Sequence, residues 1–267
     1  MKYAFCFLLF LGLLGTHQTK AQDNEIGIMG GVANYKGDLA PTIQFNEFRP
    51  AAGVFYKKNL SRFFSMGAYL THGSVGGSDQ NVETRRERNL SFESDITELS
   101  FIVEFNFLPF VKGRDPYRFT PNVFLGVGGF YFNPTTTLDG ETFELNEMRT
   151  EGQGIGNNDD GAYSLFQVAI PMGLGLKYDL APRWNLGLQA GYRYTFTDYL
   201  DDVGGQFANS GLLSEEVAPE SATLADRSAS AYGIEGRNRG DNQYNDWYFF
   251  AGFTLSYKIK NDVCYYR

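Results

Sequence analysis

Apolar side chains alternate with small or polar ones along several segments of the chain, and this period of two residues restricts the fold more than any other feature. In the clearest segment, Phe249, Phe253 and Leu255 share one face, while Thr254 and Ser256 fall on the other. Such a period places successive side chains on opposite faces of a β-strand. The pattern predicts eight strands, at Glu25–Tyr35, Ala51–Tyr56, Phe64–Leu70, Leu99–Phe107, Val123–Tyr131, Phe166–Tyr178, Asn185–Phe196 and Tyr248–Lys260.

The first 21 residues have the features of a secretory signal peptide. Lys2 is followed by an apolar stretch, Ala4–Leu14, and by a polar run that ends at Ala21. This stretch is too short for a transmembrane helix, which needs about 20 apolar residues, and no later segment offers a comparable run. We therefore predict an exported protein that is cleaved after Ala21, and we exclude a helical membrane protein.

The connections between the predicted strands alternate in length. Short ones lie at Lys57–Arg62, Leu108–Arg118 and Asp179–Arg183, and long polar ones at Lys36–Arg49, His72–Glu93, Phe132–Ser164 and Thr197–Asn245. Outer-membrane barrels combine short periplasmic turns with long extracellular loops, and have both termini in the periplasm. We predict an all-β fold, an eight-stranded antiparallel up-and-down transmembrane β-barrel at residues 22–260, with a periplasmic C-terminal tail at residues 261–267.

A soluble lipocalin-like barrel is the competing fold, because it also has eight up-and-down strands but turns its apolar side chains inward. Alternation alone does not separate the two folds, since the faces can be inverted. The chain is 16% aromatic and has 31 glycines, and its longest predicted loop covers about 49 residues. These features favour a barrel that is integral to the outer membrane and in contact with its lipid.

Charge is divided unequally between the two predicted rims. The chain has 23 Lys and Arg against 31 Asp and Glu, which argues against nucleic-acid binding. Acidic residues gather in the long loops and basic ones near the short turns. A basic rim can contact lipid head groups or an acidic periplasmic partner, and an ordinary solvated rim is an equal alternative. The predicted periplasmic rim consists of Lys57, Lys58, Arg62, Lys112, Arg114, Arg118, Arg183, Lys258 and Lys260.

Three charged residues fall on the face opposite the apolar one. They are Glu104, Lys177 and Arg193. An eight-stranded barrel is just wide enough for its own side chains to fill. We predict that these residues form a buried polar network that plugs the lumen, so that the barrel is not a diffusion pore.

The sequence offers little support for catalysis or for a bound metal. After cleavage the only histidine is His72, and no nucleophile elbow accompanies Ser74 and Ser78 near it. Acidic stretches at 139–144 and 157–160 could attract calcium, but neither has the spacing of an EF-hand loop, and solvated loops are the simpler interpretation. We predict a protein that is not an enzyme and has no cofactor.

One cysteine remains after the signal peptide removes Cys6. Cys264 lies in the predicted tail, past the last strand. An unpaired cysteine in an oxidising compartment suggests a disulfide with another protein, with a free thiol as the alternative.

Several stretches resemble the PorG-like outer-membrane proteins of the type IX secretion and gliding machinery of Bacteroidota. They are EIGIMGGVANYKGDL at 25–39, RPAAGV at 49–54, LSRFFSMG at 60–67 and the NDVC tail at 261–264. The likeness runs along the mature chain, and its first third is the specific part. After the cysteine this chain has Tyr265, Tyr266 and Arg267 where the family leads us to expect proline.

The resemblance implies a non-enzymatic barrel component of the type IX protein secretion system. Such a barrel ties a periplasmic ring, formed by a lipoprotein and its partner subunit, to the outer membrane. Cys264 matches the tail cysteine of the family and is the candidate for a disulfide to the ring lipoprotein. The alternative hypothesis is a surface-exposed adhesin or ligand-binding barrel that acts through its long acidic extracellular loops.

Overall fold

The computed structural model describes residues 24–110, 117–156, 158, 161–230, 232–241 and 243–259. The predicted signal peptide and C-terminal tail lie outside this range, as do Lys112, Arg114, Lys260 and Cys264. What the sequence analysis predicts for them stays a prediction.

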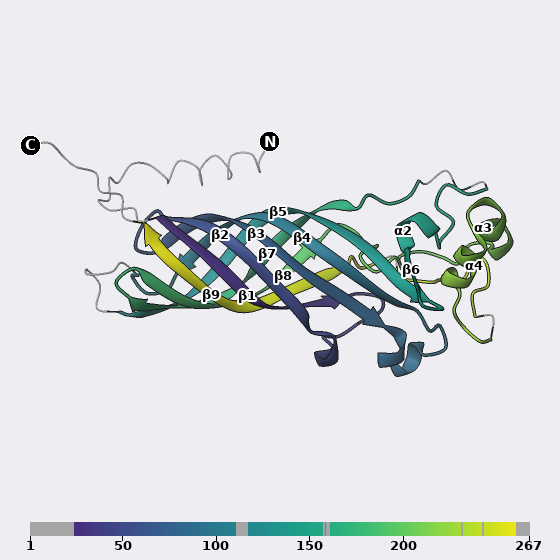
Figure 1. Cartoon of the computed structure of the whole chain (residues 1–267), viewed down its shortest axis with the longest axis horizontal. Coiled ribbons are helices and arrows are strands. Elements are labelled where there is room, and N and C mark those ends of the chain that lie inside the picture. The colour runs from purple at the N-terminus through teal and green to yellow at the C-terminus, as the bar shows by residue number, and fades with distance from the viewer. Residues whose placement is uncertain are drawn as a thin grey trace, which may run out of the picture.

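Eight antiparallel strands close into a barrel, as the alternation predicts (Figure 1). The barrel strands are β1 (Asn24–Lys36), β2 (Arg49–Asn59), β3 (Phe64–Ser78), β4 (Ser91–Asn106), β5 (Phe119–Leu138), β7 (Phe166–Ala181), β8 (Trp184–Thr195) and β9 (Trp247–Ile259). Each pairs with its neighbours along the chain, and the sheet closes where β1 pairs with β9, for example Ile26 with Tyr257. A short strand, β6 (Glu141–Glu144), pairs with the end of β5.

At the long-loop rim, β3, β4 and β5 extend well beyond their predicted ends. β3 continues to Ser78, β4 begins at Ser91 and β5 continues to Leu138, so parts of two predicted loops are strand. In this part of the strands the alternation of burial continues, but the polarity of the two faces is inverted: the outward Glu93 is exposed and the inward Phe92 is buried. Water replaces lipid around the barrel here, and the interior packs against the loops. The outward apolar side chains that identify the inner halves of these strands are therefore missing.

The short connections all lie at one rim of the barrel and the long connections at the other (Figure 1). Among the described residues, none of the helices has the length and apolar character that crossing a bilayer requires. The long connections contain six short helices: η1 (Phe45–Glu47), η2 (Asp79–Asn81), η3 (Glu83–Arg85), α2 (Leu145–Met148), α3 (Ser210–Glu216) and α4 (Pro219–Ala225).

The apolar face of the strands points outward, which excludes the soluble alternative. Leu125, Leu174 and Phe253 are 58%, 65% and 66% exposed, and each of the barrel strands carries exposed large apolar side chains. A continuous apolar belt of this extent requires hydrocarbon around it. The fold is therefore a transmembrane β-barrel.

One layer of aromatic side chains lies at each edge of the apolar belt. Tyr257 lies beside Trp184 near the short-turn rim, and Trp247 lies beside Tyr194 near the long-loop rim. Ten residues of β9 separate these layers. That length is about 33 Å at about 3.3 Å per residue, which a strand tilt of roughly 40° reduces to about 25 Å. This height matches the apolar band of outer-membrane barrels.

Glycines on the inward face make room for a large side chain. A Cβ atom at Gly173 would lie 2.6 Å from the Phe124 ring, and one at Gly191 would lie 2.5 Å from it. Phe124 packs inside the barrel with Phe55 and Ile102. The small residues that alternate with apolar ones in β7 and β8 are therefore a packing requirement of the barrel interior.

Candidate functional site

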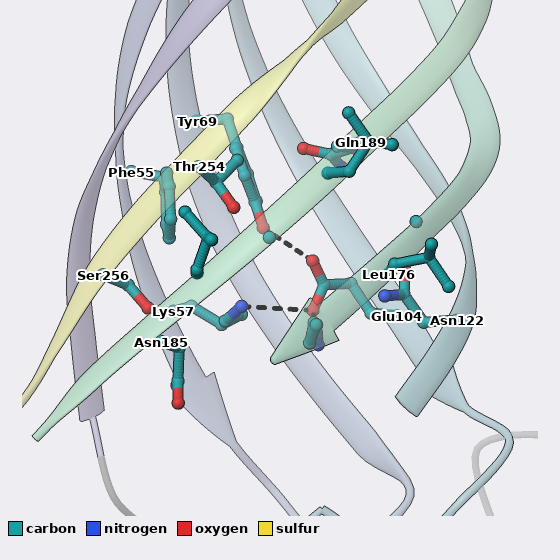
Figure 2. Close-up of a pocket in the computed structure, with 15 residues that line it drawn as sticks. Phe55, Lys57, Tyr69, Glu104, Asn122, Leu176, Asn185, Gln189, Thr254 and Ser256 are labelled. Atoms are coloured by element: carbon teal, nitrogen blue, oxygen red, sulfur yellow. Dashed lines mark hydrogen bonds and ion pairs between the residues drawn. The ribbon is translucent and has the colours of Figure 1, made fainter. Parts of the chain in front are cut away.

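A cluster of charged side chains crosses the lumen near the short-turn rim (Figure 2). We call Glu25, Lys57, Glu104 and Lys177 the lumen cluster; all four are buried. Glu104 lies at its centre. Its Oε2 atom is 3.4 Å from Lys57 Nζ and accepts a hydrogen bond from Lys177 Nζ. The Tyr69 hydroxyl donates to Glu104 Oε1 at 2.8 Å. Two acids and two bases compensate one another here, which removes the cost of an unpaired buried charge.

The remaining polar atoms of the lumen cluster also have partners. Glu25 accepts hydrogen bonds from Asn59 and Ser256, both at 2.7 Å, and lies 3.7 Å from Lys57. Lys177 donates to Asn106 Oδ1 at 3.0 Å. The sequence analysis assigned Lys57 to the basic rim, but its side chain turns into the lumen because it follows the inward-facing Phe55 by two residues in β2.

A second ion pair lies farther along the lumen. Arg193 Nε donates to Glu98 Oε2 at 3.1 Å, and the Tyr248 hydroxyl donates to the same oxygen at 2.7 Å. The Arg193 guanidinium also lies 4.6 Å from the centre of the Phe250 ring. Arg193 therefore does not share the partner of Lys177. The structure divides the three predicted lumen residues between two sites, one on Glu104 and one on Glu98.

The hollow beside Lys57, Glu104 and Lys177 is small. The cavity that the lumen cluster lines has a volume of about 20 Å³. This is room for about one water molecule. Asn185 borders this cavity, and both polar atoms of its side-chain amide are buried without a described partner. Among the described residues, this hollow is too small to let a solute pass the lumen cluster.

The long connections fold over the opposite mouth of the barrel. We call them the cap, comprising residues 37–48, 79–90, 139–165 and 196–246. Tyr35, at the end of β1, contacts the carboxylates of both Asp201 and Asp246 through its hydroxyl. Asp201 also accepts from the Leu39 backbone amide at 3.1 Å, and Asp246 from that of Leu200 at 2.9 Å. These bonds hold the last connection against the first strand.

The acids around Tyr35 lie outside the apolar belt and crowd one another. Burial, with the Asp38 carboxylate nearby, raises the pKa of Asp201 from its ordinary 3.8 to about 7. Burial, again with Asp38 nearby, raises the pKa of Asp198 to about 9. Burial and the charge of Asp201 raise the pKa of Asp246 well above its usual range. Part of this cluster therefore keeps its protons at neutral pH.

The buried Arg239 forms ion pairs at the centre of the cap. Arg239 Nη1 donates to Glu151 Oε1 at 3.2 Å, and its guanidinium also contacts Asp202. The Tyr163 hydroxyl donates to Asp202 at 2.8 Å. Burial raises the pKa of Asp202 to about 7 against the opposing charge of Arg239. These contacts join the β5–β7 connection to the β8–β9 connection.

A second arginine ties the β3–β4 connection to the same structure. Arg88 donates to both carboxylate oxygens of Asp79, at 2.7 and 2.8 Å, and to the backbone oxygen of Arg239. The four long connections are thus one folded body, with an apolar core that continues into the barrel. An outer cavity of about 570 Å³ opens between the β5–β7 and β8–β9 connections of this body.

Four of the predicted rim residues are exposed near the short turns: Lys58, Arg62, Arg118 and Arg183. Arg118 lies over the Tyr178 ring and Arg183 donates to the Tyr257 hydroxyl at 2.7 Å, so both pack on the aromatic layer of this rim. Lys258 is buried instead, with its ammonium 5.3 Å from the centre of the Phe110 ring. Fewer basic residues are exposed at the described rim than predicted, because Lys57 and Lys258 occupy positions of β2 and β9 whose side chains point into the lumen.

His72 and the acidic stretch 157–160 are the residues that the sequence suggested for catalysis and for calcium. His72 lies on the outer face of β3, where Nδ1 is 3.0 Å from Thr97 Oγ1. Within the described ranges, no group of three or more His, Cys, Asp or Glu side chains is placed to hold a metal ion. Of the acidic stretch 157–160, only Asn158 is described.

Sequence reasoning missed two residues of the lumen, Glu25 and Glu98. Glu25 stands second in β1, and Glu98 lies one residue before the predicted start of its strand. Glu98 and Glu104 are six residues apart, so they fall on the same face of β4. Continuing the alternation one residue before Leu99 would have placed Glu98 in the lumen. The contacts of Asp201 and Asp246 join residues 166 and 211 positions from Tyr35, and no local pattern could have indicated them.

Comparison with known proteins gives one family and a group of barrels. A family model described as a domain of unknown function, DUF6089, matches residues 4–211. No curated protein matches the sequence.

Three solved structures illustrate the group of barrels. Ail, the attachment invasion locus protein of Yersinia pestis, is 9% identical with a TM-score of 0.43, and the match covers 89% of this chain and 99% of Ail. Neisserial surface protein A is 9% identical with a TM-score of 0.40, covering 88% and 97%. OprG from Pseudomonas aeruginosa is 11% identical with a TM-score of 0.38, covering 88% and 97%.

Proposed function

The chain belongs to the DUF6089 family, and we propose that it is a non-enzymatic outer-membrane barrel of the type IX secretion system that anchors a periplasmic lipoprotein ring to the membrane. The observation that carries the proposal is the closed lumen. The lumen cluster and the Arg193–Glu98 pair fill the barrel from side to side, and the cap covers its outer mouth. A barrel that offers no passage acts through its surfaces.

The short-turn rim supports the choice of surface. Lys58, Arg62, Arg118 and Arg183 are exposed there, with Asp179 half-buried among them. A basic surface of this kind suits an acidic partner or anionic head groups in the periplasmic leaflet. The resemblance to PorG-like proteins favours the partner, a ring lipoprotein with its companion subunit. The machinery of the PorG-like proteins serves both secretion and gliding in some Bacteroidota, so the proposal covers either role.

The place where β9 ends supports a role for the tail. The Lys258 backbone amide donates to the Arg183 backbone oxygen at 2.8 Å, so the chain leaves the barrel beside the exposed Arg183. Residues 261–267 would then begin at the basic rim. On this proposal Cys264 forms a disulfide with the ring lipoprotein while the rim supplies electrostatic attraction.

A non-reducing gel of outer-membrane fractions tests the tail directly. We expect a reducible adduct in wild type that contains a periplasmic lipoprotein by mass spectrometry, and that is absent from Cys264→Ser. Cys6 is no competing thiol after signal cleavage, so the variant isolates one position. A monomer in both strains would remove the covalent link from the proposal.

The folded cap favours a second candidate, a surface-binding barrel. Its long connections share buried arginines and an apolar core, which suits a preformed recognition surface. Phe207 and Gly236 are joined by a backbone hydrogen bond of 2.9 Å, so residues 208–235 can be excised and the ends joined by a short glycine linker. On this candidate the excision abolishes surface attachment. On the anchor proposal it leaves secretion intact.

A further inference from the structure

The outer cavity of the cap differs from the other hollows of the protein in size and lining. Its volume is about 570 Å³, and it lies between the β5–β7 connection and the segment that leads into α3. Figure 1 shows α3 at the end of the molecule farthest from the short turns. Pockets that take small ligands have volumes of about 300–1,000 Å³. The cavity is thus large enough for a ligand of one or two rings.

An aromatic stack forms one side of the cavity. Tyr199 lines it and stacks on Tyr163, with ring centres 4.7 Å apart and planes within 8°. Tyr163 stacks in turn on the buried Phe132, at 6.2 Å and 7°. Such a stack fixes the orientation of the Tyr199 ring. Ile155 and Leu213, from a separate apolar cluster, supply further apolar lining.

A buried amide with an unused donor borders the same cavity. Gln153 is 6% exposed, and its Oε1 atom accepts from the Glu151 backbone amide at 3.3 Å. Its Nε2 atom is buried and has no hydrogen-bond partner among the described residues. A buried donor without an acceptor is unfavourable. The site is therefore complete only when a ligand or water supplies an oxygen.

The charges around the cavity exclude an anionic ligand. None of the described residues that line it is Lys or Arg. Two carboxylates are present. Glu151 pairs with Arg239 through Oε1 at 3.2 Å, while its buried Oε2 atom has no described hydrogen-bond partner, and Glu235 accepts from Asn209 at 2.9 Å. A strongly cationic ligand is not required either. The chemistry that remains is a neutral molecule with hydroxyl oxygens and an apolar face.

We propose that this cavity is a binding site for a neutral saccharide, with one pyranose ring against Tyr199 and a hydroxyl oxygen accepting from Gln153 Nε2. The C–H face of a pyranose is apolar and packs on aromatic rings, while its hydroxyl groups accept and donate hydrogen bonds. This inference rests on the surface-binding candidate and is independent of the periplasmic anchor.

Saturation-transfer NMR on the purified mature barrel in detergent tests the site. The probes are the methyl glycosides of glucose, galactose, mannose and N-acetylglucosamine, with glucuronate and glucosamine as charged comparators. We expect transfer to at least one neutral glycoside and none to glucuronate. Gln153→Ala and Gln153→Glu should each weaken binding at least tenfold, because both remove the donor, and the second keeps the volume of the side chain. Tyr199→Ala should do the same.

Matched controls come from the same connection. Gln243 and Tyr244 are exposed and do not line the cavity, so Gln243→Ala and Tyr244→Ala should bind as wild type. Circular dichroism of each variant reports whether the barrel is folded. Absence of transfer to every neutral glycoside, or equal binding by folded wild type and Gln153→Glu, would overturn the proposal. Attachment lost on excision of residues 208–235, without glycoside binding, would keep the surface-binding candidate and reject the saccharide.

Discussion

Glu104 on β4 and Lys177 on β7 meet inside the barrel, and their ion pair reaches past the intervening strand β5. Lys57 from β2 reaches the same carboxylate oxygen at 3.4 Å. The barrel is therefore closed by charges that its own strands supply. Removing one of them leaves an uncompensated charge in a small space that admits little water.

Replacing Glu104 with Gln should destabilise the barrel by about 3–5 kcal/mol, because two lysines would then share the single carboxylate of Glu25. The free energy of unfolding by urea in lipid vesicles measures the effect. Lys58→Met removes an exposed lysine of β2, next to Lys57, and should change stability by less than about 0.5 kcal/mol. Equal effects of the two variants would show that the lumen pairs contribute nothing.

Planar-bilayer recordings should find no steady open channel in the wild-type barrel. The Arg193–Glu98 pair and the lumen cluster both block the path. Replacing Arg193 and Glu98 together by Ala should leave the inner block in place and conductance low. Conductance should rise when Glu104 and Lys177 are replaced by Ala as well. A porin-sized conductance from the wild type would refute the closed lumen.

The cap should loosen as pH rises from about 4 to 9. Asp201 and Asp202 have a pKa of about 7 in the folded protein and Asp198 of about 9, each above the ordinary 3.8. A raised carboxylate pKa means that the fold favours the protonated form, so this stability is present at low pH and is lost as the acids ionise. Hydrogen exchange of the Leu200 and Val203 amides, corrected for intrinsic rates, reports the opening.

Asp198→Asn provides the control for this pH dependence. Both carboxylate oxygens of Asp198 are buried without a described hydrogen-bond partner, so the neutral amide removes a repulsive charge and no described bond. The variant should protect the same amides better than wild type at pH 8 and resemble it below about pH 4, where the Asp198 carboxyl group is protonated in the open and the closed cap alike. Protection that increases with pH in wild type would contradict the assignment.

Gly173→Ala should destabilise the barrel by about 1–3 kcal/mol, the usual cost of overpacking a filled interior. The new methyl group would meet both Phe124 and the Ala190 backbone oxygen, 2.2 Å away. Gly30→Ala is the matched control, since a Cβ atom there meets nothing within 4 Å. Urea unfolding of both variants in vesicles separates interior packing from a general effect of glycine in strands.

The parts of the fold that the sequence predicted are those that face lipid. Outward residues such as Leu125 and Phe253 must be apolar, so the period of two is strong wherever the wall meets hydrocarbon. It fades where water surrounds the barrel, which is why the outer ends of β3, β4 and β5 were assigned to loops. Lys57 was misplaced for a related reason, because the predicted strand ended at Tyr56, three residues before the end of β2.

The site was predictable only in part. Glu104, Lys177 and Arg193 were expected in the lumen from their parity, and they lie there. Their separate partners could not be deduced, because strand pairing alone does not state which inward side chains meet across a barrel. The cap depends on contacts such as Tyr35 with Asp246, between residues brought together only by closure of the barrel.

Co-purification tests the anchor most directly. An affinity-tagged barrel is extracted from chemically cross-linked membranes, as wild type and with Lys58, Arg62, Arg118 and Arg183 all changed to Ser. The proposal predicts that a periplasmic lipoprotein and a second subunit accompany the wild type in constant ratio, and that the rim variant in a Cys264→Ser background loses them while remaining folded. A wild-type barrel that purifies alone, or a rim variant that retains the same partners, would contradict it.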